Sequence, residues 1–227
     1  YDNRPARVAE SRALSDGTEI ELTAAAYAYE RSPLMERVTK TVTAAGSGQE
    51  QTSVEETYGE AAAYPYAAGQ TKFTRDIAGV ETFYNYEAAA EHGAAHKKTA
   101  VTKVGGELAA GQSRKTESFL AANDTVLVEQ ESVWDGDNWL LLSSGAHEYD
   151  EEGRRTKTTR GNGRVSATSW MCCGKLSETD EDGILTSYGY NSAHQLVETI
   201  RSEISDGDTV VTPETITTYT RDAAGRA

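Results

Sequence analysis

Short runs of alternating apolar and polar residues fill the second half of the chain, and turn residues separate them. The turns end nine to eleven residues apart, at Gly153, Gly163, Gly174, Gly183 and His194. The runs are rich in Thr, Val, Ile and Tyr, which suit a pleated surface, and none is long enough for an ordinary helix. This spacing predicts short antiparallel strands over residues 154–160, 164–170, 175–179, 184–190 and 195–202.

The turn sequence Asp-x-x-Gly has a defined physical basis. An Asp carboxylate can accept the backbone N–H two residues on, while Gly takes the left-handed conformation that closes a type I turn with a bulge. The chain holds four copies of this sequence, at Asp76/Gly79, Asp150/Gly153, Asp180/Gly183 and Asp222/Gly225. Four copies with similar neighbours indicate an internal repeat.

The residues that follow the turns recur as well. Residues 73–79 match 219–225, and residues 76–86 match 180–190. Alternate residues of a strand share a face, so the repeated tyrosines should lie on one face of the sheet. We expect them to form cross-strand ladders, in which each aromatic pair contributes roughly 0.2 to 1 kcal/mol. The tyrosines concerned are Tyr84, Tyr86, Tyr188 and Tyr190.

The sequence Tyr-Asp-x-x-Gly-Arg resembles the YD-repeat of rearrangement-hotspot (Rhs) proteins. The nearest matches are Tyr149-Asp150-Glu151-Glu152-Gly153-Arg154, the segment from Tyr219 through Asp222 and Gly225 to Arg226, and the opening Tyr1-Asp2. The resemblance implies an all-β fold of repeated antiparallel hairpins that form an extended, curved or spiralling sheet. In toxin-bearing bacterial members such a sheet makes a hollow shell around a C-terminal effector, and in teneurins it makes a similar extracellular barrel.

The resemblance covers about two thirds of the chain and divides it into three parts. Residues 1–90 and 145–227 carry YD-like hairpins, whereas 91–144 fit the pattern poorly and are expected to be a divergent segment or an insertion within the sheet. The chain begins at Tyr1 without an initiator Met or a signal pattern, and both ends look cut within a repeat. We therefore expect a segment of a longer polypeptide, which the resemblance implies is secreted or displayed on a cell surface.

Composition argues against two classes of partner. The 22 basic residues are outweighed by 36 acidic residues, which gives a formal net charge of −14, so a nucleic acid backbone or an anionic membrane surface is disfavoured. The strongly apolar stretch 139–142 is far shorter than the ~20 residues that a membrane span needs.

A sheet of sequential hairpins has open edges, which favours edge-to-edge self-association unless the ends are capped.

The adjacent Cys172 and Cys173 could form a redox-sensitive disulfide or offer two thiolates to a metal. They align with Ala67-Ala68 in the other copy of the repeat, so small residues before a turn glycine are the simpler interpretation. The chain has no further cysteine, and an adjacent pair lacks the spacing of zinc sites, so we expect no metal there.

For two other groups of polar residues a structural interpretation is favoured over a functional one. His92 and His96 could share one face of a helical turn, but Gly93 weakens such a helix and a linker is favoured. The carboxylates of 135–137, 180–182 and 206–208 could pair as acid and base in a glycosidase or bind Ca²⁺. They are centred on turns, however, and lack the pattern of a calcium-binding loop, so solvated turn residues are favoured. No Gly-x-Ser-x-Gly elbow is present. We expect no catalytic residues, no metal and no cofactor.

Trp134 and Trp139 flank a hairpin tip that could present two indoles to a sugar ring; the alternative is that both pack under the loop. The sequence therefore leaves two functions open. The first is a non-catalytic structural segment, a piece of β-sheet wall whose partners are the remainder of its polypeptide and an enclosed effector or other cargo. The second is an extracellular carbohydrate-binding or adhesion module.

Overall fold

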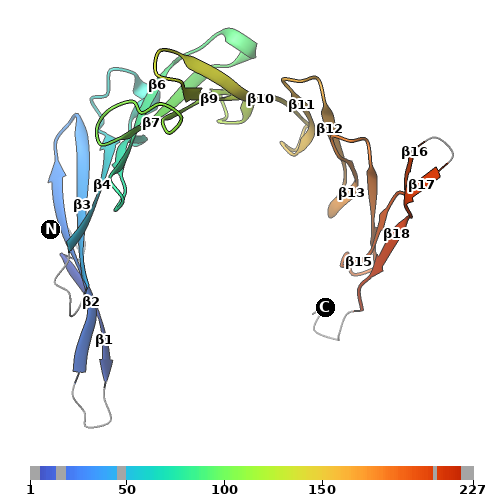
Figure 1. The fold of residues 1–227 in the computed structure, drawn as a ribbon, viewed down its shortest axis with the longest axis horizontal. Helices are drawn as coiled ribbons and strands as arrows, with labels where there is room; N and C mark the ends of the chain where they lie inside the picture. The colour runs from blue at the N-terminus through green and yellow to red at the C-terminus, as the bar shows by residue number, and fades with distance from the viewer. Residues whose placement is uncertain (1–5, 14–18, 45–49, 207–208, 221–227) are drawn as a thin grey trace. The chain divides into compact units, whose positions relative to one another are not determined.

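The computed structural model describes residues 6–13, 19–44, 50–206 and 209–220, and almost all of them lie in strands or in the turns between strands. In the main sheet β1 to β15 pair in chain order, and β18 lies next to β15. Neighbouring strands can be followed in this order in Figure 1. The prediction of an all-β fold built from repeated antiparallel hairpins is confirmed.

The chain divides into two compact units. The first comprises 1–122 and 130–142, and the second comprises 123–129 and 143–227, so β9 (Val126–Trp134) and β10 (Trp139–Tyr149) contribute to both. The expected boundaries at residues 90 and 144 do not coincide with this division and stay a prediction. Residues 91–144, which the repeat motif matches poorly, also form strands that pair in chain order.

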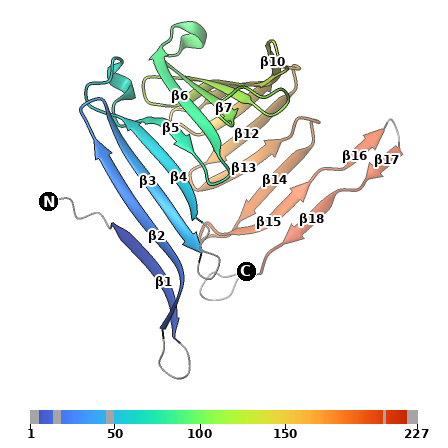
Figure 2. The ribbon, with the colours of Figure 1, turned by 60° about the vertical axis from the view of Figure 1, so that its left-hand side comes forward.

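The first unit contains the longest strands. Figure 2 shows β2, β3 and β4 side by side, paired along most of their length. Two single 3₁₀ turns, η1 (Pro65–Ala67) and η2 (Glu91–Gly93), interrupt the hairpins. Besides its share of β9 and β10, the strands of this unit are β1 (Arg7–Ala13), β2 (Glu19–Arg31), β3 (Met35–Ala44), β4 (Glu50–Tyr58), β5 (Thr71–Arg75), β6 (Val80–Ala88), β7 (His96–Val104) and β8 (Arg114–Leu120).

The second unit follows the predicted rhythm of short strands. Its strands are β11 (Arg155–Arg160), β12 (Val165–Met171), β13 (Gly174–Thr179), β14 (Leu185–Tyr190), β15 (Leu196–Arg201), β16 (Ile204–Asp206), β17 (Thr209–Thr212) and β18 (Thr215–Thr218). Each of the five predicted strands lies within one residue of an observed one, β11 to β15. The β16–β17 hairpin forms a separate two-stranded sheet.

The repeat is confirmed at the level of strand register. In the β5–β6 hairpin Phe73 pairs with Phe83, and in the β13–β14 hairpin Ser177 pairs with Ser187. These pairs occupy the positions that the alignment of 76–86 with 180–190 makes equivalent. Both hairpins therefore have one register relative to their Asp-x-x-Gly turn.

The hydrogen bonds expected of the Asp-x-x-Gly turn form in three of the four predicted copies. Asp76, Asp150 and Asp180 each accept, through Oδ1, the N–H two residues on at 2.9, 3.2 and 3.0 Å. The same oxygen accepts the N–H four residues on at 2.9, 2.8 and 2.9 Å. One carboxylate oxygen thus binds two backbone N–H groups in each turn.

The glycines of these three turns take the predicted left-handed conformation. Gly79, Gly153 and Gly183 have φ of +81°, +78° and +83°. A Cβ at any of them would meet no other atom within 4 Å, so the backbone conformation, and not a lack of space, explains the choice of glycine.

The ends of the repeat pattern are only partly visible. Asp222 and Gly225 of the fourth copy lie outside the described residues, as do Tyr1 and Asp2. The backbone N–H of Tyr219, which opens that copy, donates to the Val197 carbonyl at 2.8 Å. The turn that should follow Tyr219 therefore stays a prediction.

A further turn has the same geometry with different residues. Asn191 Oδ1 accepts the N–H groups of Ala193 and Gln195 at 2.9 and 3.0 Å. His194 stands where the other turns have Gly, and its φ is +58°. An amide oxygen accepts the same two bonds as a carboxylate, whereas a non-Gly residue in the left-handed region carries a steric cost.

Few side chains are buried. Among the described residues six hydrophobic side chains are less than a tenth exposed: Ala67, Tyr86, Ala94, Phe119, Leu120 and Val128. The three consecutive leucines of β10, residues 140–142, are 50%, 59% and 52% exposed although adjacent strand residues point to opposite faces. Both faces of the sheet are therefore uncovered at β10, and the strands depend on pairing with their neighbours.

An aromatic cluster lies where the connection between β4 and β5 meets the sheet. The ring of Tyr86 lies edge-on to Tyr58 and Tyr66, with 6.0 Å between centroids in each case, and its burial raises its pKa to about 12. Tyr66 stacks on His96 at 3.8 Å, and the Tyr64 hydroxyl is hydrogen bonded to His96 Nδ1 at 2.6 Å. The connection between β4 and β5 thus folds back over the sheet.

A buried carboxylate joins three strands in the same unit. Glu56 on β4 is paired with Arg37 on β3, whose Nε lies 2.8 Å away, and with Lys72 on β5, whose Nζ lies 3.3 Å away. Burial acts to raise the pKa of Glu56, but the hydrogen bonds and charges of Arg37 and Lys72 outweigh it and lower that pKa below its usual value. The ionised carboxylate is therefore the stabilising form.

We expect this ion pair to make stability depend on pH. Above the usual carboxyl pKa near 4.5, Glu56 contributes its full stabilisation, and the contribution is lost as pH falls through the lowered folded-state pKa. Glu56→Gln should lower the melting temperature at pH 7 by about 2 to 4 °C, and the difference from the unmodified chain should shrink as the buffer is acidified. Thermal unfolding between pH 7 and pH 3 measures both.

Glu55→Gln is the matched control, because Glu55 is the exposed neighbour of Glu56 and points to the opposite face. It should leave the melting temperature at pH 7 unchanged. Equal melting temperatures for Glu56→Gln and the unmodified chain at neutral pH would contradict the role given to this carboxylate.

Candidate functional site

The hairpin tip with the two tryptophans is tightly organised. Asp135 Oδ1 accepts the N–H groups of Asn138 and Asp137 at 2.7 and 2.8 Å, and these backbone hydrogen bonds lower the pKa of Asp135. The rings of Trp134 and Trp139 are half-buried, 5.4 Å apart and inclined by 60°. Lys115 Nζ lies 5.7 Å from the centre of the Trp139 ring.

This arrangement does not offer the two indoles as one flat platform. The edge of one ring meets the face of the other, as in an ordinary edge-to-face aromatic pair. The Lys115 ammonium occupies part of the space over Trp139. Both interpretations, packing of the rings under the loop and binding of a glycan by Trp134 and Trp139, stay predictions.

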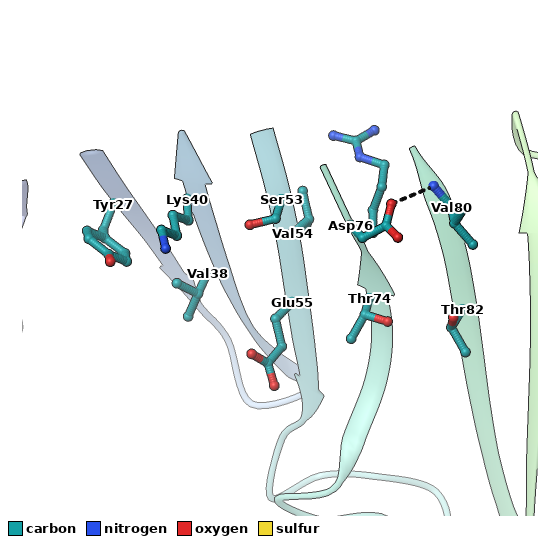
Figure 3. Close-up of a pocket in the computed structure, with 11 residues that line it drawn as sticks. Tyr27, Val38, Lys40, Ser53, Val54, Glu55, Thr74, Asp76, Val80 and Thr82 are labelled. Atoms are coloured by element: carbon teal, nitrogen blue, oxygen red, sulfur yellow. Dashed lines mark hydrogen bonds between the residues drawn. The ribbon is translucent and has the colours of Figure 1, made fainter. Parts of the chain in front are cut away.

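An open groove of 420 Å³ lies on the face of β2 to β6 (Figure 3). Figure 3 shows Val38, Glu55, Thr74 and Thr82 in a row across four neighbouring strands. The strand register explains this row, because Val38 pairs with Glu55, Glu55 with Thr74, and Thr74 with Thr82. Tyr27, Lys40 and Ser53 form a second row beside it.

The chemistry of the groove is mixed. Its lining includes small hydroxyls, the three valines Val38, Val54 and Val80, and charges of both signs, and the Asp76 carboxylate at its rim accepts hydrogen bonds from the backbone of its own turn. Such a surface is the ordinary solvated face of an antiparallel sheet.

The second unit has a cavity lined by basic residues, and its volume of 220 Å³ is smaller than that of the groove on β2 to β6. His147, Arg155, Lys157 and Arg160 contribute to its lining. Burial and the Arg155 charge lower the pKa of His147, whose Nδ1 is hydrogen bonded to Thr158 Oγ1 at 3.1 Å. Lys157 and Arg160 are paired with Glu148 and Glu181, so these two cations are already neutralised.

His92 and His96, which the sequence could place on one helical face, lie in two different elements. His92 lies in η2 with φ +57° and meets the edge of Phe119 at 4.8 Å, while His96 opens β7 and stacks on Tyr66. The short 3₁₀ turn agrees with the favoured linker. The helical face that would bring both imidazoles together is not formed.

The structure separates the cysteine pair from its supposed counterpart. Cys172 and Cys173 are exposed and form the two-residue loop between β12 and β13. Ala67, by contrast, is 3% exposed and ends η1 within a twelve-residue connection. The interpretation that Ala67-Ala68 occupy the same structural position is therefore wrong.

The fold brings a third potential ligand to this pair. One ligand atom each from Cys172, Cys173 and His194 lies within 4.8 Å of the other two, and all three residues are exposed. A hydrogen bond with Cys172, together with burial and the Cys172 charge, raises the pKa of Cys173. The spacing of residues along the chain does not reveal His194 as a ligand, because His194 and the cysteines lie in two separate loops.

The repeat tyrosines act mainly through their hydroxyl groups in the second unit. Tyr149 and Tyr190, each directly before a turn Asx residue, donate to the carbonyl oxygens of Val126 and Lys175 at 2.6 and 2.9 Å. These carbonyls belong to the preceding strand of the same hairpin. The Tyr-Asx pair thus fixes both the strand partner and the turn that follows.

Of the four tyrosines expected in ladders, Tyr86 contacts other tyrosine rings, whereas the described contacts of the other three are with a lysine, a carboxylate and a backbone carbonyl. In the first unit Tyr84 lies under Lys98, whose Nζ is 5.2 Å from the ring centre, and Tyr86 belongs to the aromatic cluster. At the equivalent position in the second unit Tyr188 donates to the Glu178 carboxylate; its burial and this bond raise its pKa to about 12. Both Tyr84 and Tyr188 are half-buried.

Comparison with known proteins gave results at the level of structure alone. No protein-family model matches the chain, and no curated protein matches it. Solved structures that resemble it include one titled "Crystal Structure of TcdB2-TccC3-TEV", with 16% identity, a TM-score of 0.46, and coverage of 95% of this chain and 12% of that chain. Another, of TcdB2-TccC3 without its hypervariable C-terminal region, has 15% identity and a TM-score of 0.46.

A third, titled "Crystal Structure of TcdB2-TccC3", matches with 12% identity, a TM-score of 0.26 and coverage of 92% of this chain. The chain spans between 12% and 17% of the lengths of these three matched chains.

Within the described residues, no helix has the length and apolar character needed to cross a membrane.

We expect the Tyr190 hydroxyl to stabilise the second unit. Tyr190→Phe keeps the ring but leaves the Lys175 carbonyl without its donor, which should lower the free energy of unfolding by about 1 kcal/mol. Urea unfolding should show a lower midpoint with an unchanged slope. Tyr84→Phe serves as the control, because its described contact is made through the ring, and should leave the midpoint unchanged. If Tyr190→Phe and Tyr84→Phe have the same urea midpoint, the Tyr190 hydroxyl does not stabilise the second unit.

Proposed function

We propose that this chain is a non-catalytic structural segment, a piece of β-sheet wall in a larger protein of the Rhs/YD-repeat type. One observation carries the proposal: within the described residues sixteen strands pair antiparallel, almost entirely in chain order, and an Asx turn recurs between them. Such a chain extends a sheet by adding hairpins, and each hairpin brings its own turn and its own strand partner.

The distribution of burial supports a wall more than a self-contained domain. Compact domains of this size enclose a core between two layers, whereas six hydrophobic side chains are buried among the described residues here. Exposed apolar residues such as Leu141 and Val211, at 59% and 64%, are suited to contact with further parts of a polypeptide.

The titratable groups of the described residues also favour a structural role. Those with clearly lowered carboxyl pKa values, Glu56, Glu117, Glu178, Asp135 and Asp150, are all held by cations or by turn backbone. Each is therefore engaged in joining strands or closing turns. An acid or base that acts on a substrate must instead face a cavity with its proton-exchanging atom free.

The sequence resemblance gives the proposal its finer form. We place the wall in a secreted or surface-displayed bacterial protein, where the remainder of the polypeptide continues the sheet and the closed shell holds a toxin or other effector. The exposed edges of β1 and β18 are the surfaces through which the sheet would continue, and in an isolated chain they are open to a second copy.

Electron cryo-microscopy of the full-length natural polypeptide tests this proposal. We expect β1 and β18 each to gain an antiparallel neighbour strand from the same polypeptide, so that the described sheet is one stretch of a longer one. If instead both edges face solvent and the chain stands as a separate domain, the wall is excluded.

A panel of hydrolase substrates tests the absence of catalysis on the chain itself. We expect no turnover above that of a heat-denatured sample. A rate that a single substitution abolishes would show that the chain carries an active site.

A further inference from the structure

We propose that Cys172, Cys173 and His194 form a zinc site that joins two neighbouring loops of the second unit. The loops are the two-residue connection between β12 and β13 and the Asn191 turn between β14 and β15. This inference does not depend on the proposed wall function, because all three ligands lie within one compact unit.

The distances suit a single small ion. In a tetrahedral zinc site, with Zn–S near 2.3 Å and Zn–N near 2.0 Å, neighbouring ligand atoms are about 3.5 to 3.8 Å apart. The three ligand atoms lie within 4.8 Å of one another, and the two sulfur atoms are 2.8 Å apart. All three residues are exposed, and the two sulfur atoms need to separate by about 1 Å to reach the zinc geometry.

Contacts that do not involve the three ligands already hold the two loops in place. Met171 pairs with Gly174 across the β12–β13 loop, and the Met171 carbonyl also accepts a bond from Arg154 Nη1 at 3.0 Å. Tyr190 packs so closely on Gly174 that a Cβ there would lie 2.5 Å from the tyrosine hydroxyl. Because Tyr190 directly precedes Asn191, this contact fixes one loop against the other.

The ligand set selects the ion. Two thiolates and an imidazole match the borderline-soft Zn²⁺ and are poor ligands for Ca²⁺ or Mg²⁺, which prefer oxygen. Three protein ligands leave the fourth position to water, which agrees with the exposure of all three residues. The ion would clip together two hairpins in a sheet that buries few side chains, and binding to the folded state alone raises its stability.

Titration of the reduced, metal-free 227-residue chain with Co²⁺ tests the site. We expect a thiolate-to-cobalt charge-transfer band that saturates at one equivalent and disappears when Zn²⁺ is added. X-ray absorption of the zinc-loaded chain should show two sulfur atoms at about 2.3 Å and one protein nitrogen at about 2.0 Å. Surface carboxylates cannot produce the charge-transfer band.

Two site variants separate ligation from folding. Cys173→Ser should lower zinc affinity at least tenfold. His194→Gly should do the same and yet raise the melting temperature of the metal-free chain, because glycine relieves the left-handed backbone at φ +58°. These opposite effects cannot come from a general loss of structure.

His92→Gly is the matched control, since His92 has nearly the same backbone conformation, φ +57°, and lies in the first unit. Its zinc affinity should equal that of the unmodified chain. A missing charge-transfer band, or unchanged zinc affinity in either site variant, would overturn the proposal.

Discussion

Antiparallel backbone pairing between neighbouring strands is the interaction on which the rest of this structure depends. A strand whose faces are both partly exposed gains little from burial, so its N–H and C=O groups must find partners in the adjacent strands. The Asx turn makes this pairing local: one side-chain oxygen binds two backbone N–H groups and returns the chain beside the strand it has just left. Repetition of such a turn yields a long sheet without a large core.

The parts of the fold that were predictable are those that local chemistry determines. The spacing of turn residues such as Gly153, Gly163 and Gly183 located β11 to β15 to within a residue, because Asp, Asn and Gly leave few alternatives for the backbone at a tight turn. The same chemistry explains the turn at Asn191, where His194 replaces the glycine without changing the hydrogen bonds.

The parts that were not predictable depend on contacts between residues distant in the chain. Ala67 is buried within the connection between β4 and β5, so its alignment with the cysteine loop was misleading. The approach of His194 to Cys172 and Cys173 likewise arises from the pairing of four strands. The tyrosine hydroxyls bond to carbonyl oxygens, and sequence periodicity places a ring on a face without identifying such a partner.

Amide hydrogen exchange followed by NMR tests the repeated turn most directly. The N–H groups that bond to the Asx side chains four residues earlier are those of Val80, Arg154, Ile184 and Gln195. All four should exchange far more slowly than in an unfolded peptide, because each bond must open before exchange occurs. Exchange at the unfolded-peptide rate at two or more of these positions would contradict the shared turn geometry.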